Sequence, residues 1–138
     1  MRNAKPLRFI LVLSGLVVIG IGAASLFTPV AFHGVNGIEL GGDAGLLSET
    51  RAAGGALLAT GVLITLGAFV SRLAFTATAV GAVIYLSYGL SRVLSIALDG
   101  MPSNGLVLAT VLEVVIGAAC AFALVRYHRG GAEAGRPE

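Results

Sequence analysis

The chain has 138 residues, of which 57% are hydrophobic and only 12% are charged, and its formal net charge is +2. Together with a mean hydropathy of +0.95, this composition excludes an ordinary soluble domain, in which about a quarter of the residues are charged. The 20 glycines are spread through apolar runs and follow no collagen-like period. We therefore expect one compact membrane domain.

Four apolar segments are long enough to span a membrane. A helix rises about 1.5 Å per residue, so about 20 residues cross a hydrocarbon core about 30 Å thick. The pattern predicts spans at about residues 7–27, 51–70, 73–98 and 105–126. Because these apolar runs are continuous and do not alternate with polar residues, they exclude a transmembrane β-barrel.

The first segment starts with basic residues, including Lys5 and Arg8, and ends near the small residues Ala23 and Ala24. Cleaved signal peptides share this organisation. The apolar stretch is longer than the ~7–15 residues of a signal-peptide core, so we favour a membrane span.

A long connection, Thr28–Thr50, separates the first two spans and contains His33. It is long for a simple turn. Two alternatives remain open, a partial lid over the bundle and a disordered loop. At its end, Ser48 or Thr50 is expected to cap the second helix.

The other connections are short. Only Ser71 and Arg72 separate the second and third spans, which forces a tight hairpin, and Pro102 and Gly105 break the chain before the fourth. The expected fold is an all-α, integral-membrane, up-down four-helix bundle. This single domain covers residues 1–129 and is followed by a short polar tail, residues 130–138.

Lysine and arginine are unequally divided between the two sides of such a bundle. The side of the N-terminus carries seven of them: Arg2, Lys5, Arg8, Arg72, Arg126, Arg129 and Arg136. The opposite side carries only Arg51 and Arg92. The positive-inside rule therefore predicts that both termini are cytoplasmic. The same rule explains the basic residues without a nucleic-acid partner, and we expect none.

Two charged residues, Arg92 and Glu113, interrupt the third and fourth spans. By helical rise both lie about 9–12 Å below the outer ends of their helices. A charge at such a depth costs at least about 2.5–3.5 kcal/mol, so each should face the bundle interior and find a partner. Their similar depths on consecutive antiparallel helices predict an Arg92–Glu113 ion pair.

Polar residues form one stripe on the third span. Tyr85, Tyr88, Arg92, Ser95 and Asp99 recur at helical spacing toward the outer surface. The stripe places two tyrosines on the same face as the membrane-embedded arginine.

Small residues mark the faces that should contact neighbouring helices. Gly54 and Gly61 lie seven residues apart on the second span, and Gly117 and Ala121 follow Glu113 at four-residue intervals on the fourth. Small side chains allow helices to approach closely. Glu113 is therefore expected to point at a neighbouring helix.

Arg51 is placed at the start of the second helix, where the helix dipole disfavours a cation. We expect compensation from Glu49, Asp99 or Glu113. One interpretation is a structural ion network that fixes helix register. The other is a polar pocket, lined by the tyrosines and open to the outer side, in which Arg51 and Arg92 bind an anion.

Familiar catalytic and cofactor motifs are absent from the chain. The single cysteine, Cys120, excludes an intramolecular disulfide and a dithiol pair and is expected to be a small core residue. His33 and His128 lie outside the spans, which argues against transmembrane haem ligation. We name no catalytic residue, metal ligand or cofactor, and the sequence favours a non-enzymatic role.

The charged motifs resemble a bacterial family known as domain of unknown function 4345. The resemblance rests on Glu49-x-Arg51-Ala52-x-Gly54-Gly55, on Gly89-x-x-Arg92-x-x-Ser95-x-x-x-Asp99-Gly100-x-Pro102-Ser103, and on Glu113. It covers about residues 7–124, and Ala53 stands where the family pattern has an aromatic residue.

The resemblance implies a small four-helix protein of the bacterial inner membrane with no assigned activity, distantly similar to the DoxX-like group. It also implies a polar centre made of Arg51, Arg92, Asp99 and Glu113, but no reaction.

The expected function is therefore a small membrane protein whose buried charged centre is structural and binds a small anionic or lipid-like ligand. The alternatives are a membrane subunit of a quinone- or thiol-linked redox system and a small proton-coupled transporter. The expected partners are the lipid bilayer, such a ligand or a partner membrane protein, with a homo-oligomer left open.

Overall fold

The computed structural model describes residues 4–133, with side chains described for residues 5–126. In chain order its elements are α1 (Ala4–Phe27), α2 (Pro29–Gly34), α3 (Ala44–Gly67), the 3₁₀ turn η1 (Ser71–Leu73), α4 (Ala74–Asp99) and α5 (Asn104–Glu133). Within this range there is no strand. Helices α1, α3, α4 and α5 are long and apolar enough to cross a membrane. The expected all-α four-helix architecture is confirmed, and the chain is a multi-pass membrane protein.

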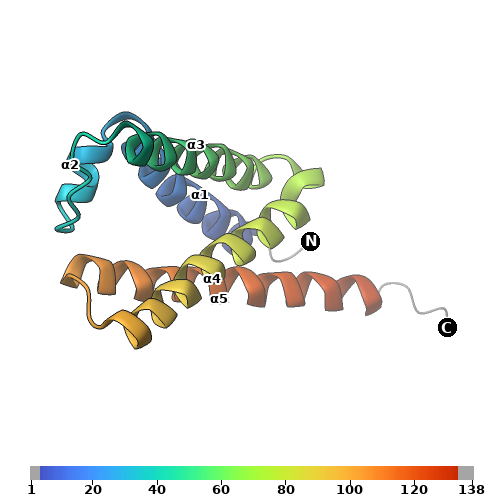
Figure 1. Ribbon diagram of the computed structural model, residues 1–138. Coiled ribbons are helices and arrows are strands. Elements are labelled where there is room, and N and C mark those ends of the chain that lie inside the picture. The colour runs from blue at the N-terminus through green and yellow to red at the C-terminus, as the bar shows by residue number, and fades with distance from the viewer. Residues whose placement is uncertain (1–3, 134–138) are drawn as a thin grey trace.

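The four long helices form two antiparallel pairs. Helix α1 packs along α3 and α4 packs along α5, whereas contacts between the pairs are fewer. The pairs come together near η1 and diverge toward the end of the molecule that carries α2 (Figure 1). The arrangement is a wedge, closed at one end.

Glycines bring the backbones of α1 and α3 into direct contact. A Cβ at Gly61 would lie 2.6 Å from the backbone nitrogen of Ile19 and 2.8 Å from the carbonyl oxygen of Gly15. A Cβ at Gly54 would lie 2.9 Å from the carbonyl oxygen of Gly22. Each helix thus supplies two glycines seven residues apart, and the contact face predicted on the second span is confirmed.

The described core lies where the pairs meet. Leu11, Ile64 and Ala77 form a buried cluster contributed by α1, α3 and α4. Cys120 is fully buried, as expected for a small core residue. The hydroxyl of Tyr85 donates a hydrogen bond of 2.6 Å to the carbonyl oxygen of Ser14 and so links α4 to α1.

Helix α3 begins at Ala44, seven residues before the expected start of the second span. The side chain of Asp43 caps it by accepting a hydrogen bond of 2.7 Å from the backbone nitrogen of Leu46. The expected cap at Ser48 or Thr50 is wrong, because Thr50 lies inside the helix and its hydroxyl donates to the carbonyl oxygen of Leu46 at 2.8 Å. An apolar run marks only the membrane-embedded part of a helix, and α3 continues beyond it.

The other boundaries lie close to expectation, except at the C-terminus. Helix α5 runs to Glu133, so the first residues of the expected polar tail are helical. Residues 134–138, with Arg136, and the side chains of His128 and Arg129 lie outside the described residues, as does Arg2.

The long connection folds as a short helix and two glycine turns. Pro29 occupies the first turn of α2, where its missing N–H costs no hydrogen bond. Gly37 and Gly41 have φ values of +75° and +58°, a conformation that favours glycine. The connection therefore forms a partial lid and not a disordered loop. Helix α2 and the residues that follow it cover the open end of the wedge (Figure 1).

Candidate functional site

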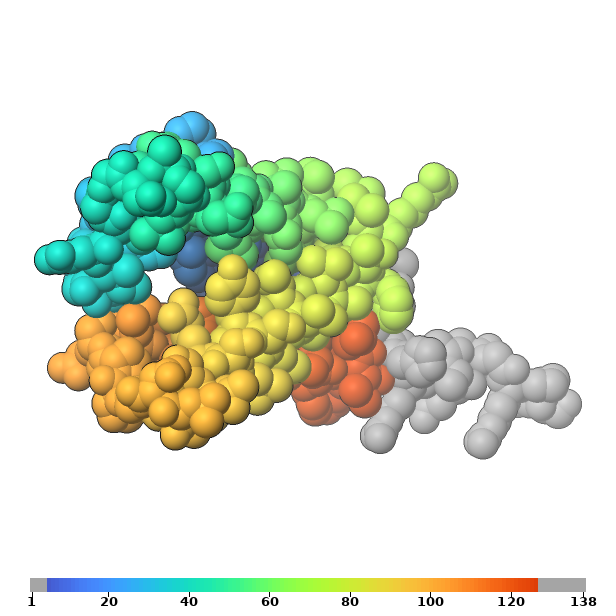
Figure 2. Space-filling view, viewed as in Figure 1, coloured from blue at the N-terminus to red at the C-terminus, as the bar shows by residue number. Residues whose placement is uncertain are grey.

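A cavity of about 590 Å³ lies between the two helix pairs, beneath the lid. Figure 2 shows the molecule hollowed on this side, between α2 and the start of α5. Side chains from α1, α2, α3, α4 and α5 line it. Ligand-binding cavities typically measure about 300–1,000 Å³, so this one has the size of a binding site.

Most of the cavity wall is apolar. The aliphatic lining residues are Val17, Val18, Ile21, Ile38, Ala53, Leu57, Ile84, Leu106, Ala109, Leu112 and Ile116. The four long helices all contribute to this set, so the apolar part of the cavity extends between the two pairs.

Arg92 and Glu113 form the charged part of the wall. The Nε of Arg92 donates to both carboxylate oxygens of Glu113, at 2.9 Å to Oε2 and 3.2 Å to Oε1. The Glu113 side chain is 10% exposed and that of Arg92 is 33% exposed. Gly89, one turn before Arg92, allows α5 to come near, since a Cβ there would lie 2.8 Å from a Val114 methyl group. The structure therefore brings the predicted pair together across α4 and α5.

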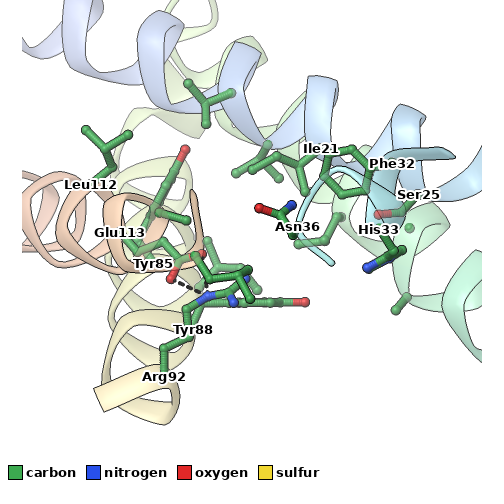
Figure 3. Close-up of a pocket in the computed structure, with 18 of the residues that line it drawn as sticks. Ile21, Ser25, Phe32, His33, Asn36, Tyr85, Tyr88, Arg92, Leu112 and Glu113 are labelled. Carbon is green, nitrogen blue, oxygen red and sulfur yellow. Dashed lines mark hydrogen bonds and ion pairs between the residues drawn. The ribbon is translucent and has the colours of Figure 1, made fainter. Parts of the chain in front are cut away.

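Two side chains at this end of the cavity, Arg92 and Tyr88, have hydrogen-bond donors without a partner in the part of the chain that the structure describes. Within the described residues, neither terminal nitrogen of Arg92 donates a hydrogen bond, and the Tyr88 hydroxyl has no partner. Both side chains line the cavity (Figure 3). The ion pair thus leaves the outer edge of the guanidinium free.

The second tyrosine of the predicted stripe has a different role. The ring of Tyr85 lines the cavity, but its hydroxyl is bonded to the Ser14 carbonyl oxygen of α1. Figure 3 shows this hydroxyl directed away from Arg92. Tyr85 therefore contributes a ring to the wall and a link between the helix pairs.

The lid supplies four side chains that the sequence did not predict as site residues. Phe32, His33, Asn36 and Ile38 all line the cavity. The Nε2 of His33 is buried and has no hydrogen-bond partner among the described residues. Phe32 packs edge-on against His33 with ring centroids 5.3 Å apart. The length of the connection was the only sequence signal for these residues.

Arg51 does not belong to the cavity. Its Nη1 donates to the carbonyl oxygen of Leu26 in the last turn of α1, and its side chain is exposed. Carbonyl groups at the end of a helix lack intrahelical partners and carry the negative end of its dipole. The expected compensation by Glu49, Asp99 or Glu113 is therefore wrong, because a backbone oxygen pairs with Arg51.

The two remaining acidic residues, Glu49 and Asp99, differ in position, because only Glu49 lines the cavity. Glu49 lines the cavity from the first turns of α3. Asp99 is exposed at the end of α4, where it accepts a hydrogen bond of 3.0 Å from the hydroxyl of Ser95, and it is not part of the lining. Of the seven predicted site residues, the structure gathers five around the cavity: Glu49, Tyr85, Tyr88, Arg92 and Glu113.

No cluster of three or more His, Cys, Asp or Glu that could hold a metal ion occurs in the part of the chain that the structure describes.

Residues 6–124 match the family described as Domain of unknown function (DUF4345), so the chain belongs to this family, as the charged motifs predicted. The match spans both helix pairs and the lid, and with them every residue of the cavity. The description of the family assigns no biochemical role. Comparisons with curated proteins and with solved structures gave no match.

Proposed function

We propose that this member of the DUF4345 family is a membrane binding protein that holds one amphiphilic molecule in the cavity between its helix pairs. The observation that carries the proposal is the placement of unused donors on Arg92 and Tyr88 in a wall that is mostly apolar. An apolar body would fill the space between the pairs, and a polar head would lie beside Arg92.

Hydrogen-bond energetics support an occupant at this position. A polar group without a partner in an apolar environment costs about 1–3 kcal/mol. The Nε2 of His33 is such a group, buried in the lid that closes the same cavity. Oxygen atoms in the head group of a ligand would accept from Arg92 and Tyr88, and a hydroxyl would pair with the Nε2 of His33 in either tautomer.

The Arg92–Glu113 pair would also have a structural role. It joins α4 to α5 and leaves neither charge alone in the apolar interior. Removing one partner of a buried pair is costly, because it strands the other charge. The pair would thus hold the head-group end of the cavity in shape while it presents the free edge of the guanidinium.

The proposed setting is the bacterial inner membrane, with both termini in the cytoplasm. The distribution of basic residues supports this orientation, since Lys5, Arg8, Arg72 and Arg126 lie toward the η1 end of the helices. The cavity and lid would then face the periplasmic side. Alkaline phosphatase fused after Gly42 should be active, whereas a fusion after Arg129 should be inactive. The reverse pattern would contradict the orientation.

Co-purification tests the binding function. Ala109→Trp places a large ring in the cavity wall, and Ala118→Trp places the same ring on the exposed face of the same helix. Protein purified in mild detergent is extracted with organic solvent, and the extract is analysed by mass spectrometry.

We expect an amphiphile in near-stoichiometric amount from the wild type and from Ala118→Trp, and at least about tenfold less from Ala109→Trp. Equal recovery from all three proteins would contradict binding in the cavity.

A further inference from the structure

The charges around the cavity are unevenly matched. Its charged lining residues are Arg92, Glu49 and Glu113. One positive and two negative side chains leave the lining at −1, with Glu49 exposed to solvent. Arg51, the second cation expected at an anion site, is paired with the end of α1 instead.

The one cation in the lining is already neutralised. Glu113 accepts the Nε–H of Arg92 at 2.9 Å and is buried beside it. A second anion on the same guanidinium would be held close to the Glu113 carboxylate, whose side chain is only 10% exposed, and like charges at that separation repel. The pair therefore offers hydrogen-bond donors without a net positive charge.

We propose that the head group of the bound amphiphile is uncharged and accepts hydrogen bonds through oxygen atoms, as an ester or a hydroxyl does. This inference rests on the proposed binding function and narrows its ligand class. The Arg92 terminal nitrogens and the Tyr88 hydroxyl donate to one head-group oxygen. A carboxylate, phosphate or sulfate head is disfavoured.

The lid indicates a head group with more than one polar atom. Figure 3 shows Arg92 and Tyr88 on one side of the cavity and His33 on the other, with Asn36 between them. The unpartnered Nε2 of His33 therefore lies apart from the guanidinium. A small polyol ester, which carries several oxygens on one apolar chain, can reach both positions.

Three amphiphiles with the same twelve-carbon chain test the charge of the head. Monolaurin is neutral, laurate is anionic and dodecyltrimethylammonium is cationic. Binding of each to the purified protein is measured by native mass spectrometry from a nonionic detergent, with Ala109→Trp as the blocked control. We expect monolaurin to bind at least about tenfold more tightly than laurate, which the Glu113 carboxylate repels, and than dodecyltrimethylammonium, whose head accepts no hydrogen bond from Arg92 or Tyr88.

Glu113→Gln sharpens the test, because it leaves the charge of Arg92 uncompensated while an amide oxygen can still accept its Nε–H. The ratio of laurate to monolaurin affinity should rise at least about tenfold. Asp99→Asn removes an equal charge from an exposed position outside the lining and should leave this ratio unchanged. Melting of the purified variants checks that they are folded.

The outcomes separate the two proposals. If no compound binds the wild type better than Ala109→Trp, the binding function fails. If binding requires the open cavity but laurate or the ammonium compound binds as tightly as monolaurin, the binding function stands and the neutral head group is overturned. If Glu113→Gln does not fold, the wild-type ratio alone decides.

Discussion

The two helix pairs solve the same packing problem in different ways. Between α1 and α3 the backbones come into contact, because a Cβ at Gly15, Gly22, Gly54 or Gly61 would lie less than 3 Å from a backbone atom of the other helix. Between α4 and α5 the atoms nearest to a Cβ at Gly89 or Gly117 belong to side chains, at 2.8 Å, and the nearest backbone nitrogens lie at 3.2 and 3.0 Å. A Cβ at Gly89 would meet a methyl group of Val114, and the same interface holds the one ion pair found among the described residues.

The two helix pairs therefore contribute differently to the cavity. Backbone atoms cannot move aside as side chains can, so the α1–α3 contact tolerates less added volume. Side-chain contacts leave room for polar groups, so the α4–α5 pair carries the charged part of the cavity. The core near η1 joins the two pairs and leaves their other ends apart.

The largest expected effect comes from the glycine contact. Gly61→Ala would place a Cβ 2.6 Å from the backbone nitrogen of Ile19, which cannot move without separating α1 from α3. We expect a loss of about 3 kcal/mol in unfolding free energy, measured by titration with SDS in mixed micelles. The control is Gly55→Ala on the same helix, where a Cβ meets nothing within 4 Å.

If Gly89→Ala lowers the unfolding free energy as much as Gly61→Ala does, the two helix pairs do not differ in their packing. We expect about 1 kcal/mol for Gly89→Ala, since the Val114 side chain can adjust and the Val114 backbone nitrogen would lie 3.2 Å from the added Cβ, farther than the 2.6 Å at Gly61.

The second largest effect concerns the ion pair. Arg92→Met should cost about 2 kcal/mol, because it leaves the Glu113 carboxylate buried without a cation. Adding Glu113→Leu should recover much of that loss, and the double-mutant cycle gives the coupling energy. A double variant as unstable as Arg92→Met would show that the α4–α5 pair does not depend on direct pairing of these charges.

A smaller effect tests the link between the pairs. Tyr85→Phe removes the hydrogen bond to the Ser14 carbonyl oxygen and should cost about 1 kcal/mol in the same SDS titration. Tyr88→Phe removes a hydroxyl that has no partner among the described residues, and it should leave stability nearly unchanged. Equal effects of the two substitutions would argue against Tyr85 as the connection.

The smallest expected effect is at the outer end of the glycine-packed pair. Arg51→Leu removes the cation that pairs with the last turn of α1 and should cost about 0.5 kcal/mol, since the site is exposed. Arg72→Leu, at an exposed turn position, should change the unfolding free energy by less. If Arg51→Leu destabilises the protein as much as Arg92→Met, the two arginines are not as different as their contacts imply.

Several parts of the site follow from the sequence because the bilayer limits the choices. A charge in hydrocarbon needs a partner, and only Glu113 lies at the depth of Arg92 on a neighbouring helix. The position of Arg51 was not predictable in the same way. Its partner is a backbone oxygen at the end of another helix, and every helix end offers such oxygens without any mark in the sequence.

The lid lay beyond sequence analysis for a related reason. Phe32, His33 and Asn36 follow no periodic pattern, and their position depends on how α2 packs over the space between the helix pairs. Gly15 and Gly22, in contrast, repeat the seven-residue spacing of Gly54 and Gly61, and this repetition was a readable signal.

Hydropathy, helical rise and the cost of buried charge were enough to determine four membrane-spanning helices and one ion pair, because each depends on properties of single residues against a uniform solvent. The cavity, the lid over it and the set of charged residues that line it were decided by tertiary structure. They depend on the angle at which two helix pairs diverge, and that angle is set by the summed shapes of many side chains and glycines on both surfaces.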